Sequence, residues 1–283
     1  MKKRKKRFGN CLYFLKTRAL LWTTFIIVGS LIGCRKSSTQ EIQVGPPPSP
    51  NWMLIQESSD EFNGSSLDLT KWNTKLGYRT SGVFAFNSNN IEVSGGHLNL
   101  SAKKEDFNAK SYTSAFLESK FSDPGNGSFV EVRAKTTDVR ANTCCAIWEQ
   151  NFPLLQALDP NPEIDIQEYL LSGANGNPNR VQSTLHRWYV PSGHSMDAYK
   201  TYDTLVPLCN DFHSYGLERR EGKLSFYIDG YKYWEYSVTS MPEYVKMSRH
   251  IIFSIEGHAG NPVDSYLPAV FQIDYIRIYK LVN

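Results

Sequence analysis

Short stretches in which apolar and polar residues alternate recur along the chain beyond residue 51. The segments 98–102, 130–135 and 224–229 carry an apolar side chain at every second position, and a period of two indicates β-strands with one buried face. The pairs Gly95-Gly96 and Asp229-Gly230 interrupt such segments and are typical of tight hairpin turns. No stretch shows sustained helical periodicity with caps at both ends. About a dozen strands without helical crossovers predict an all-β protein, an antiparallel sandwich or barrel.

The first 33 residues follow a different pattern. Eight Lys and Arg and no acidic residue lie in this segment, whose second half is an apolar run over 19–32. Fourteen apolar residues fall short of the roughly 20 that span a bilayer, so the segment predicts a secretory signal peptide over 1–33. A signal anchor with an incidental cysteine is the alternative. Residues 31–34, Leu-Ile-Gly-Cys, resemble the bacterial lipobox, which implies cleavage before Cys34 and lipidation of Cys34.

Residues 34–51 contain a Ser/Thr/Gln run and four prolines within residues 46–50, but almost nothing that could build a core. This composition predicts a tether that is extended where the prolines cluster. Together with the signal, it predicts an extracytoplasmic protein, on a bacterial outer membrane or cell surface. Membrane contact is expected only through the lipid on Cys34.

Net charge changes sign once the termini are separated. The whole chain is +3, with 31 basic and 28 acidic residues. Residues 1–51 hold ten of the basic and one of the acidic residues, which leaves 31 − 10 = 21 against 28 − 1 = 27, or −6. A basic nucleic-acid binder is therefore excluded. No internal repeat is present, which disfavours a propeller or solenoid. About 230 residues can bury a sizeable core as one domain over 52–283, and we expect this domain to act as a monomer.

Three cysteines lie in this body, at Cys144, Cys145 and Cys209. In an oxidising compartment, one of the adjacent pair could bridge to Cys209 and leave the other free. A vicinal bridge between Cys144 and Cys145 would be strained. The spacing of Cys and His along the chain does not predict a zinc site.

The segment 162–169, Pro-Glu-Ile-Asp-Ile-Gln-Glu-Tyr, concentrates acids among isoleucines. In a regular strand Glu163 and Asp165 share one face and the isoleucines share the other. Glu168 would then face the core, unless a β-bulge near Gln167 returned it to the acidic face. The pattern therefore predicts a bulge.

Three carboxylates on one face repel each other, and glycoside hydrolysis uses such a set. A retaining enzyme needs two carboxyl groups about 5–5.5 Å apart, one as nucleophile and one as general acid/base. A charged neighbour raises the pKa of the second group and keeps it protonated. A solvated acidic edge and a calcium site are the alternatives, although calcium prefers oxygen ligands on flexible loops.

Glu-Ile-Asp-Ile-Gln-Glu resembles the bulged signature of family 16 glycoside hydrolases. The resemblance extends over most of the body, through segments 60–64, 183–186, 211–215, 227–230 and 273–279. It implies a jelly-roll β-sandwich with an open substrate cleft on its concave sheet. It also implies that Glu163 is the nucleophile, Asp165 its helper and Glu168 the acid/base. No cofactor is required, but the resemblance implies a structural calcium for which Asp274 is the candidate ligand; an ordinary exposed Asp is the alternative.

Aromatic and polar side chains near the acids are candidate subsites, because sugars present apolar faces ringed by hydroxyls. Trp148 precedes the acidic strand where the family usually places a cleft tryptophan, and Trp188 lies on the strand expected to follow. His186 could bind the sugar or the acid/base, or serve a structural role. Core packing is the alternative for both tryptophans.

The chain departs from family members that act on β-1,3-glucans. It has Asn161-Pro162 where they usually carry Trp-Pro, and the segment 255–260 where they carry Gly-Gly-x-Trp. Glu256 falls where galactan-active relatives often place a polar contact. These features favour an agar-, porphyran- or carrageenan-type galactan, with a β-1,3- or β-1,3-1,4-glucan as the alternative.

Arginines could recognise sulfate on such a galactan through bidentate hydrogen bonds. Arg187, Arg140 and Arg79 are the candidates, each of which could equally be a surface residue. A surface glycan-binding lipoprotein without turnover is the alternative from another class, and a purely structural lipoprotein is a third. Neither of these needs paired acids.

Overall fold

The alternating segments form strands where the sequence predicts them. Leu98, Leu100 and Ala102 are fully buried on one strand, β6, which spans His97–Phe107. The hairpin turns are also confirmed, because Asp229 and Gly230 have φ angles of 50° and 76° and Gly95 and Gly96 have 63° and 78°. Positive φ at both central residues matches the twist of a two-residue hairpin, and glycine adopts it at little cost.

The computed structural model describes residues 51–74, 80–151, 160–168, 176–189, 193–258 and 260–282. All of them belong to one of the chain's two compact units, Ile42–Asn283. The predicted signal peptide, Cys34 and all of the predicted tether except Asn51 lie outside the described residues. Among the described residues, no helix combines the length and apolar character that a membrane crossing would require.

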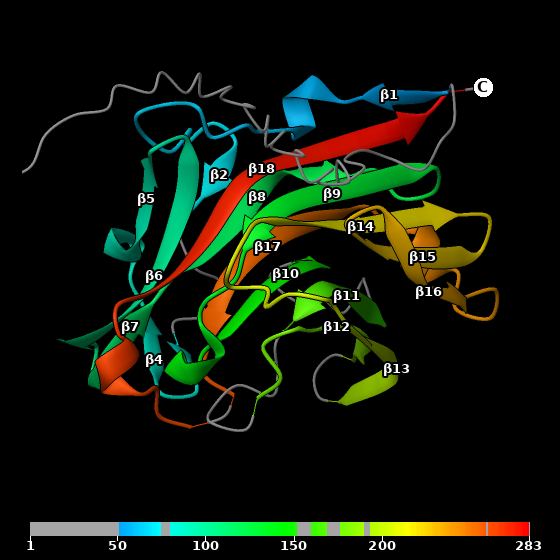
Figure 1. The fold of residues 1–283 in the computed structure, drawn as a ribbon. Coiled ribbons are helices and arrows are strands. Elements are labelled where there is room, and N and C mark those ends of the chain that lie inside the picture. Colours follow the sequence, from blue (N-terminus) through cyan, green and yellow to red (C-terminus); the bar gives the residue numbers. More distant parts are fainter. Residues whose placement is uncertain are drawn as a thin grey trace, which may run out of the picture. The chain divides into compact units, whose positions relative to one another are not determined.

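Two β-sheets make up this unit (Figure 1). The larger is 11-stranded and its main path runs β16 (Tyr231–Ser237), β15 (Lys223–Ile228), β14 (His213–Arg220), β9 (Ser128–Lys135), β18 (Ala269–Leu281), β6 (His97–Phe107), β7 (Lys110–Ser114), β4 (Phe84–Phe86) and β3 (Thr80–Ser81). Two further strands join it, β1 (Trp52–Leu54) on β18 and β5 (Ile91–Ser94) on β6. Pairing is antiparallel except between β4 and β7.

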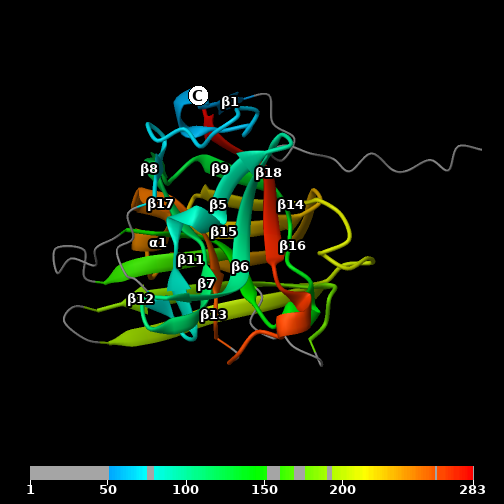
Figure 2. The same ribbon diagram turned by 90° about the vertical axis from the view of Figure 1, so that its left-hand side faces the viewer.

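The smaller sheet is 7-stranded and carries the acidic segment. Its order is β13 (His194–Asp203), β12 (Arg180–Trp188), β11 (Asn161–Glu168), β10 (Cys144–Gln150), β17 (Arg249–Glu256), β8 (Phe116–Asp123) and β2 (Trp72–Asn73). Figure 2 shows β11, β12 and β13 side by side. Helical turns are short: α1 (Glu243–Lys246) and the 3₁₀ turns Gln56–Ser58, Ser88–Asn90, Val139–Ala141 and Asp264–Tyr266.

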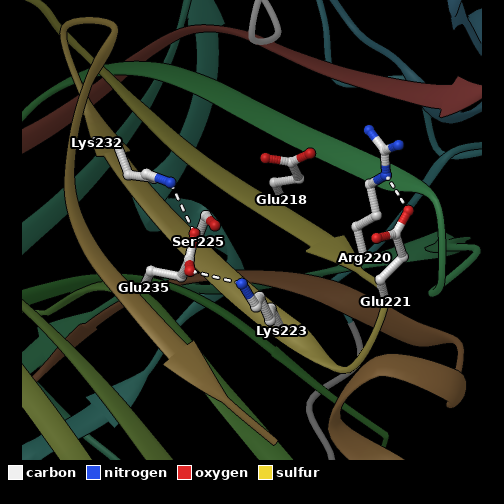
Figure 3. Close-up of a pocket in the computed structure, with 7 residues that line it drawn as sticks. All are labelled: Glu218, Arg220, Glu221, Lys223, Ser225, Lys232 and Glu235. Atoms are coloured by element: carbon white, nitrogen blue, oxygen red, sulfur yellow. Dashed lines mark hydrogen bonds and ion pairs between the residues drawn. The ribbon is translucent and has the colours of Figure 1, made fainter.

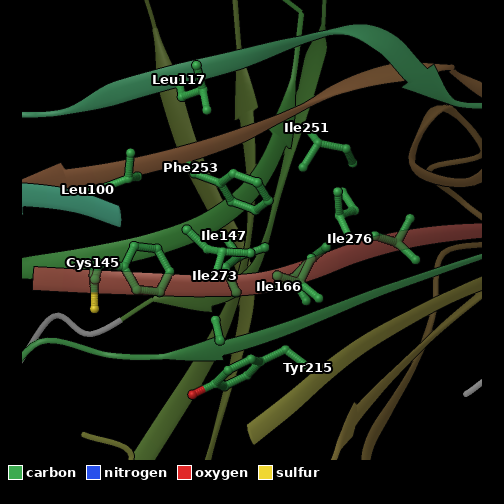
Figure 4. Packing of buried hydrophobic residues seen from close by; sticks show 14 of the residues in the cluster. Leu100, Leu117, Cys145, Ile147, Ile166, Tyr215, Ile251, Phe253, Ile273 and Ile276 are labelled. Atoms are coloured by element: carbon green, nitrogen blue, oxygen red, sulfur yellow. The ribbon is translucent and has the colours of Figure 1, made fainter. Parts of the chain in front are cut away.

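Buried apolar side chains from both sheets pack into one core. In Figure 4, Ile147, Ile166 and Phe253 of the smaller sheet lie near Ile273 and Ile276 of β18. Burying apolar surface of this kind is the main favourable contribution to folding. The predicted β-sandwich is therefore confirmed, with more strands than the sequence pattern alone resolves.

A second apolar cluster lies on the other face of the smaller sheet, away from this core. It contains Trp148 and Ala146 of β10, which alternate with the core residue Ile147, and is completed by Phe86, Phe116 and Ile252. We call this side of the smaller sheet the acidic face, because the next subsection places Glu163, Asp165 and Glu168 on it. The cluster therefore packs buried apolar side chains on the acidic face.

Four charged side chains are buried completely between the sheets. Arg219 of β14 donates from Nε to Asp123 Oδ2 of β8 at 2.7 Å, and Arg219 Nη2 lies 3.7 Å from Glu149 Oε2 of β10. Arg249 Nε of β17 lies 3.6 Å from the same Glu149 oxygen. All four side chains are 0% exposed. Burial is the main cause that raises the pKa of Glu149 to about 8, and the charge of Arg219 opposes it. Burial and then the charge of Arg219 lower the pKa of Arg249 to about 9.

Replacing Arg219 by Met should destabilise the fold, because the substitution leaves the Asp123 carboxylate buried without its cation. We expect Arg219→Met to lower the free energy of unfolding by about 3–5 kcal/mol, measured by urea denaturation. Arg220→Met is the matched control, since that side chain is 42% exposed and pairs only with the exposed Glu221. Equal stability of the two variants would contradict a sheet-to-sheet role for Arg219.

Candidate active site

The predicted β-bulge is present on β11 and sets the direction of the acids. Asp165 pairs with Thr184 and Glu168 with Gln182, so three steps along β11 match two along β12. The register with β10 also shifts at this point. Ile164 and Ile166 both enter the core. The extra residue lets Ile166 stay buried while Glu168 returns to the face that holds Thr184, whose Oγ1 donates to Glu168 Oε2 at 3.4 Å.

Glu163 is held by two N–H donors. Gln150 Nε2 donates to Glu163 Oε2 at 2.6 Å, and Trp188 Nε1 donates to the same oxygen at 3.0 Å. Burial and then the charge of Asp165 raise the pKa of Glu163 well above its usual range, and His186 and the Trp188 donor offset part of this rise. Hydrogen bonds to a carboxylate favour its ionised form. The two N–H donors therefore favour the charged form of Glu163 over that of a neighbouring acid that has no such donors.

Asp165 lies between the two glutamates on the strand and is 4% exposed. Burial and then the charge of Glu256 raise its pKa. Its Oδ2 lies 3.3 Å from His186 Nε2 and accepts no hydrogen bond from any described residue. Two adjacent buried carboxyl groups cannot both ionise freely. Since Glu163 has two donors and Asp165 Oδ2 has none, we infer that the proton shared by this pair resides on Asp165.

Glu168 is the candidate proton donor. Burial and then Asp165 raise its pKa to about 8, while His258 and His186 lower it. A carboxylic acid with such a pKa is largely protonated at neutral pH and can release its proton to a leaving group. The two glutamates on one bulged strand therefore occupy chemically different environments.

Histidines and tryptophans border this set. His186 pairs with Glu163 in the β11–β12 register, and its Nδ1 lies 2.8 Å from His194 Nε2. The His194 ring also stacks on Trp188, with centroids 4.3 Å apart. Trp188 thus combines a stacked face with its hydrogen bond to Glu163. His186 and Trp188 are brought to the carboxylates as the sequence predicts, whereas a contact of either with sugar stays a prediction.

Trp148 and Glu256 lie on the acidic face, joined by a hydrogen-bonded chain. Trp148 pairs with Asp165 across β10 and β11 but is only 5% exposed, and its Nε1 donates to Ser254 Oγ at 3.0 Å. Ser254 in turn donates to Glu256 at 2.8 Å, and Ser81 of β3 donates to the other oxygen of Glu256 at 3.0 Å. Both side chains are therefore fixed in place beside the acids.

His258 connects Glu256 with Glu168. Its Nε2 lies 3.3 Å from Glu256 Oε2, and the hydrogen bond to Glu256 is the main cause of its raised pKa. Burial raises the pKa of Glu256, but the bonds from His258, Ser254 and Ser81 outweigh it and lower the pKa overall. Three residues of this site, His258, Gln150 and Ser81, are not among the candidates that the sequence predicts. His258 stands two residues after Glu256, whereas no local pattern marks the other two.

Arg187 does not join the site. It alternates with His186 and Trp188 on β12, and its guanidinium binds Asp197 with Nε–Oδ2 at 2.5 Å and Nη2–Oδ1 at 2.9 Å. A contact of Arg187 with substrate stays a prediction. Arg140 likewise makes bidentate bonds to Asp138, and Arg79 lies outside the described residues.

Asp274 lies in a small group of charged side chains, and its role as a calcium ligand stays a prediction. Arg133 donates to one of its carboxylate oxygens, and His97 Nε2 lies 3.8 Å from the other. Among the described residues, no group of three converging Asp, Glu, His or Cys ligand atoms includes Asp274. No disulfide joins Cys144, Cys145 and Cys209 to one another. Cys144 faces Glu256 across the sheet, whereas Cys145 enters the core.

A surface hollow of about 210 Å³ lies on the larger sheet rather than beside the acids (Figure 3). Its charges are largely paired with one another, as Glu235 accepts from both Lys223 and Lys232 at 3.0 and 2.7 Å. Exposed pairs of this kind contribute little to stability. Nothing in this hollow resembles the chemistry of the acidic face.

Retaining glycoside hydrolysis requires two carboxyl groups, one as nucleophile and one as general acid/base, and the bulged strand of this two-sheet fold carries two glutamates in different environments. The chain belongs to glycoside hydrolase family 16, because the family model described as the GH16 domain of β-porphyranases A to D matches residues 52–281. It is therefore a glycoside hydrolase.

Individual relatives are more distant. The chain is 26% identical over 299 residues to the β-glucanase of Rhodothermus marinus, covering 95% of this chain and 98% of that one. It is 27% identical over 245 residues to the clotting factor G alpha subunit of Tachypleus tridentatus, covering 82% of this chain but only 34% of that longer protein. Among solved structures, the fold matches β-agarase A of Zobellia galactanivorans with a TM-score of 0.72 at 22% identity, covering 86% of this chain and 98% of that one.

The raised pKa of Glu168 predicts an alkaline limit to activity. A donor that must be protonated loses function as the pH rises through about 8. His258→Asn removes a positive charge that lowers the pKa of Glu168, so the alkaline limb of the kcat/KM profile should move to higher pH. His97→Asn, on the other sheet, is the control. An alkaline limb that stays in place in His258→Asn would contradict the coupling of His258 to the proton donor.

Proposed function

We propose that the protein is an endo-acting, retaining hydrolase of a β-linked polysaccharide, with Glu163 as nucleophile, Asp165 as its helper and Glu168 as acid/base. The observation that carries this proposal is the bulge between Asp165 and Glu168. Without it, Glu168 would face the core and the acidic face would hold no second glutamate from β11. Family membership supports the reaction class.

In the first step Glu163 attacks the anomeric carbon while Glu168 protonates the departing glycosidic oxygen. The N–H groups of Gln150 and Trp188 hold one oxygen of Glu163, which directs the other toward the sugar. Protonated Asp165 limits the negative charge beside the nucleophile. Positioning and charge placement of this kind account for much of an enzyme's rate enhancement.

In the second step the deprotonated Glu168 takes a proton from water, which attacks the glycosyl-enzyme and releases Glu163. Loss of the negative charge on Glu163 during the covalent intermediate lowers the pKa of nearby acids, so Glu168 can act as a base at this stage. Two inversions give net retention at the anomeric carbon.

A red-algal galactan of the agar, porphyran or carrageenan type is the proposed substrate. Support comes from the porphyranase description of the matching family model and from Glu256, whose carboxylate is fixed by Ser81 and Ser254 beside the acids. A β-glucan is the second candidate, supported by the full-length match to a β-glucanase. A glycan-binding protein without turnover is the alternative from another class, and it would not need a tuned pair of glutamates.

Selectivity for sulfated sugar would have to come from local contacts. Residues 52–283 carry a net charge of −6, which gives no long-range attraction for a polyanion. Arg187 and Arg140 are held by Asp197 and Asp138. The ring nitrogens of His194 and His186, next to Trp188, are candidate hydrogen-bond donors to a sulfate on the acidic face.

Replacing the nucleophile separates hydrolysis from binding. Glu163→Ala should lower the release of reducing ends by at least about a thousandfold, on whichever of agarose, porphyran, carrageenans, laminarin and lichenan the wild type cleaves. Added azide should restore turnover and give a glycosyl azide of inverted configuration, because it attacks in place of the missing carboxylate.

Glu221→Gln is the control, since Glu221 is 74% exposed on the other sheet. Wild-type protein that binds a glycan and releases no reducing ends would overturn the proposal that this chain hydrolyses polysaccharide. A Glu163→Ala variant as active as the control would overturn the assignment of Glu163 alone.

We also propose that residues 1–33 direct export and that Cys34 is lipidated, leaving the domain on a membrane-anchored tether outside the cytoplasm. The support is the basic and apolar pattern that ends in Leu-Ile-Gly-Cys. The full chain, expressed in a bacterium with labelled palmitate, should incorporate label and sediment with membranes, whereas Cys34→Ser should not. Labelled Cys34→Ser, or an unlabelled wild type, would contradict the anchor.

A further inference from the structure

Three different metal-binding side chains converge beside the proposed acid/base. One ligand atom each from Cys144 of β10, Glu168 of β11 and His258, just after β17, lie within 4.8 Å of one another. These residues are far apart in the sequence, so no sequence motif predicts the cluster. The sheet brings them together, because Cys144 pairs with Glu256 and His258 follows Glu256 by two residues.

The chemistry of this donor set is specific. A thiolate, an imidazole and a carboxylate together suit zinc and related divalent ions, whereas calcium and magnesium take oxygen ligands. Three protein ligands and an open fourth position are typical of an exchangeable zinc site. Ligand atoms around tetrahedral zinc lie roughly 3.3–3.8 Å apart, so inward adjustments of these side chains from within 4.8 Å would close the cluster around an ion.

The cluster is open on one side and closed on the other. Cys144 is 2% exposed and forms the floor, Glu168 is partly exposed, and the His258 side chain is 45% exposed. An ion can therefore enter past the histidine and reach the buried sulfur. Glu256 lies 3.3 Å from His258, and a carboxylate partner of this kind orients a ligating imidazole and increases its basicity.

We propose that Cys144, His258 and Glu168 form a binding site for zinc or a similar thiophilic divalent cation, and that occupation of this site inhibits the enzyme. Binding takes the thiol proton, and the proton of Glu168, into solvent. The carboxylate that should donate a proton to the leaving oxygen is then held by the metal. The inhibitory half rests on the proposed role of Glu168, whereas the binding half stands on the donor geometry alone.

Direct binding tests the site without reference to catalysis. We expect the full chain to take up one equivalent of Zn²⁺ in calorimetry, and Co²⁺ to give a thiolate-to-cobalt absorption band. Cys144→Ser should abolish the band and weaken Zn²⁺ binding by at least about tenfold, and His258→Ala should weaken binding similarly. Cys145→Ser is the matched control, because this neighbouring thiol enters the core instead.

A cobalt band that persists in Cys144→Ser, or that is lost in Cys145→Ser, would overturn the site. So would a wild type that binds no Zn²⁺, provided that its unfolding transition shows it is folded.

Inhibition is measured on any polysaccharide that the wild type cleaves. Zn²⁺ should lower the wild-type rate at least about tenfold, with recovery on addition of a chelator, and Mg²⁺ should have no effect. Each variant is compared with its own rate without metal, and Cys144→Ser should resist Zn²⁺ while Cys145→Ser does not. Equal sensitivity of the two variants would overturn the inhibitory role. A chain that binds Zn²⁺ through Cys144 but cleaves no polysaccharide would overturn the proposed function and leave the metal site standing.

Discussion

Crowded carboxyl groups on a β-strand repel one another, and the acidic face depends on how that repulsion is managed. The bulge on β11 turns Glu168 to the same side as Glu163 and Asp165, while Ile164 and Ile166 remain in the core. The strand thus satisfies both the core and the site. Burying charged groups is unfavourable, and here only one of the three has to be charged. Glu163 accepts hydrogen bonds from two N–H donors, whereas its neighbours keep their protons.

Residues of the neighbouring strands make the surroundings of the three carboxyl groups different. Gln150 of β10 and Trp188 of β12 reach Glu163 from the two strands that flank β11. On and just after β17, the other neighbour of β10, Ser254, Glu256 and His258 form a second polar group. The charges of His258 and Glu256 shift the pKa of Glu168. The apolar cluster around Trp148 lies on the same face. Because these donors come from regular strands, their positions are fixed by the sheet and need little ordering when substrate binds.

Much of the fold follows from local sequence pattern, and part of the site does not. Alternation at Leu98, Leu100 and Ala102 predicts a strand with one buried face, and the spacing of Glu163, Asp165 and Glu168 predicts the bulge, because both depend only on a strand's period of two. The strand count and the burial of Arg219 depend on long-range pairing that no short window contains. The ion pair of Arg187 is not visible in the sequence for the same reason, because its partner, Asp197, is ten residues away on the next strand.

Trapping the covalent intermediate tests the central claim most directly. A fluorinated glycoside of the cleaved sugar, with a good leaving group, slows breakdown of the glycosyl-enzyme so that it accumulates. The account predicts that mass spectrometry of the full chain shows one added glycosyl unit and that peptide mapping places it on Glu163. An adduct on Asp165 or Glu168 would contradict the account, as would hydrolysis with inversion and no adduct.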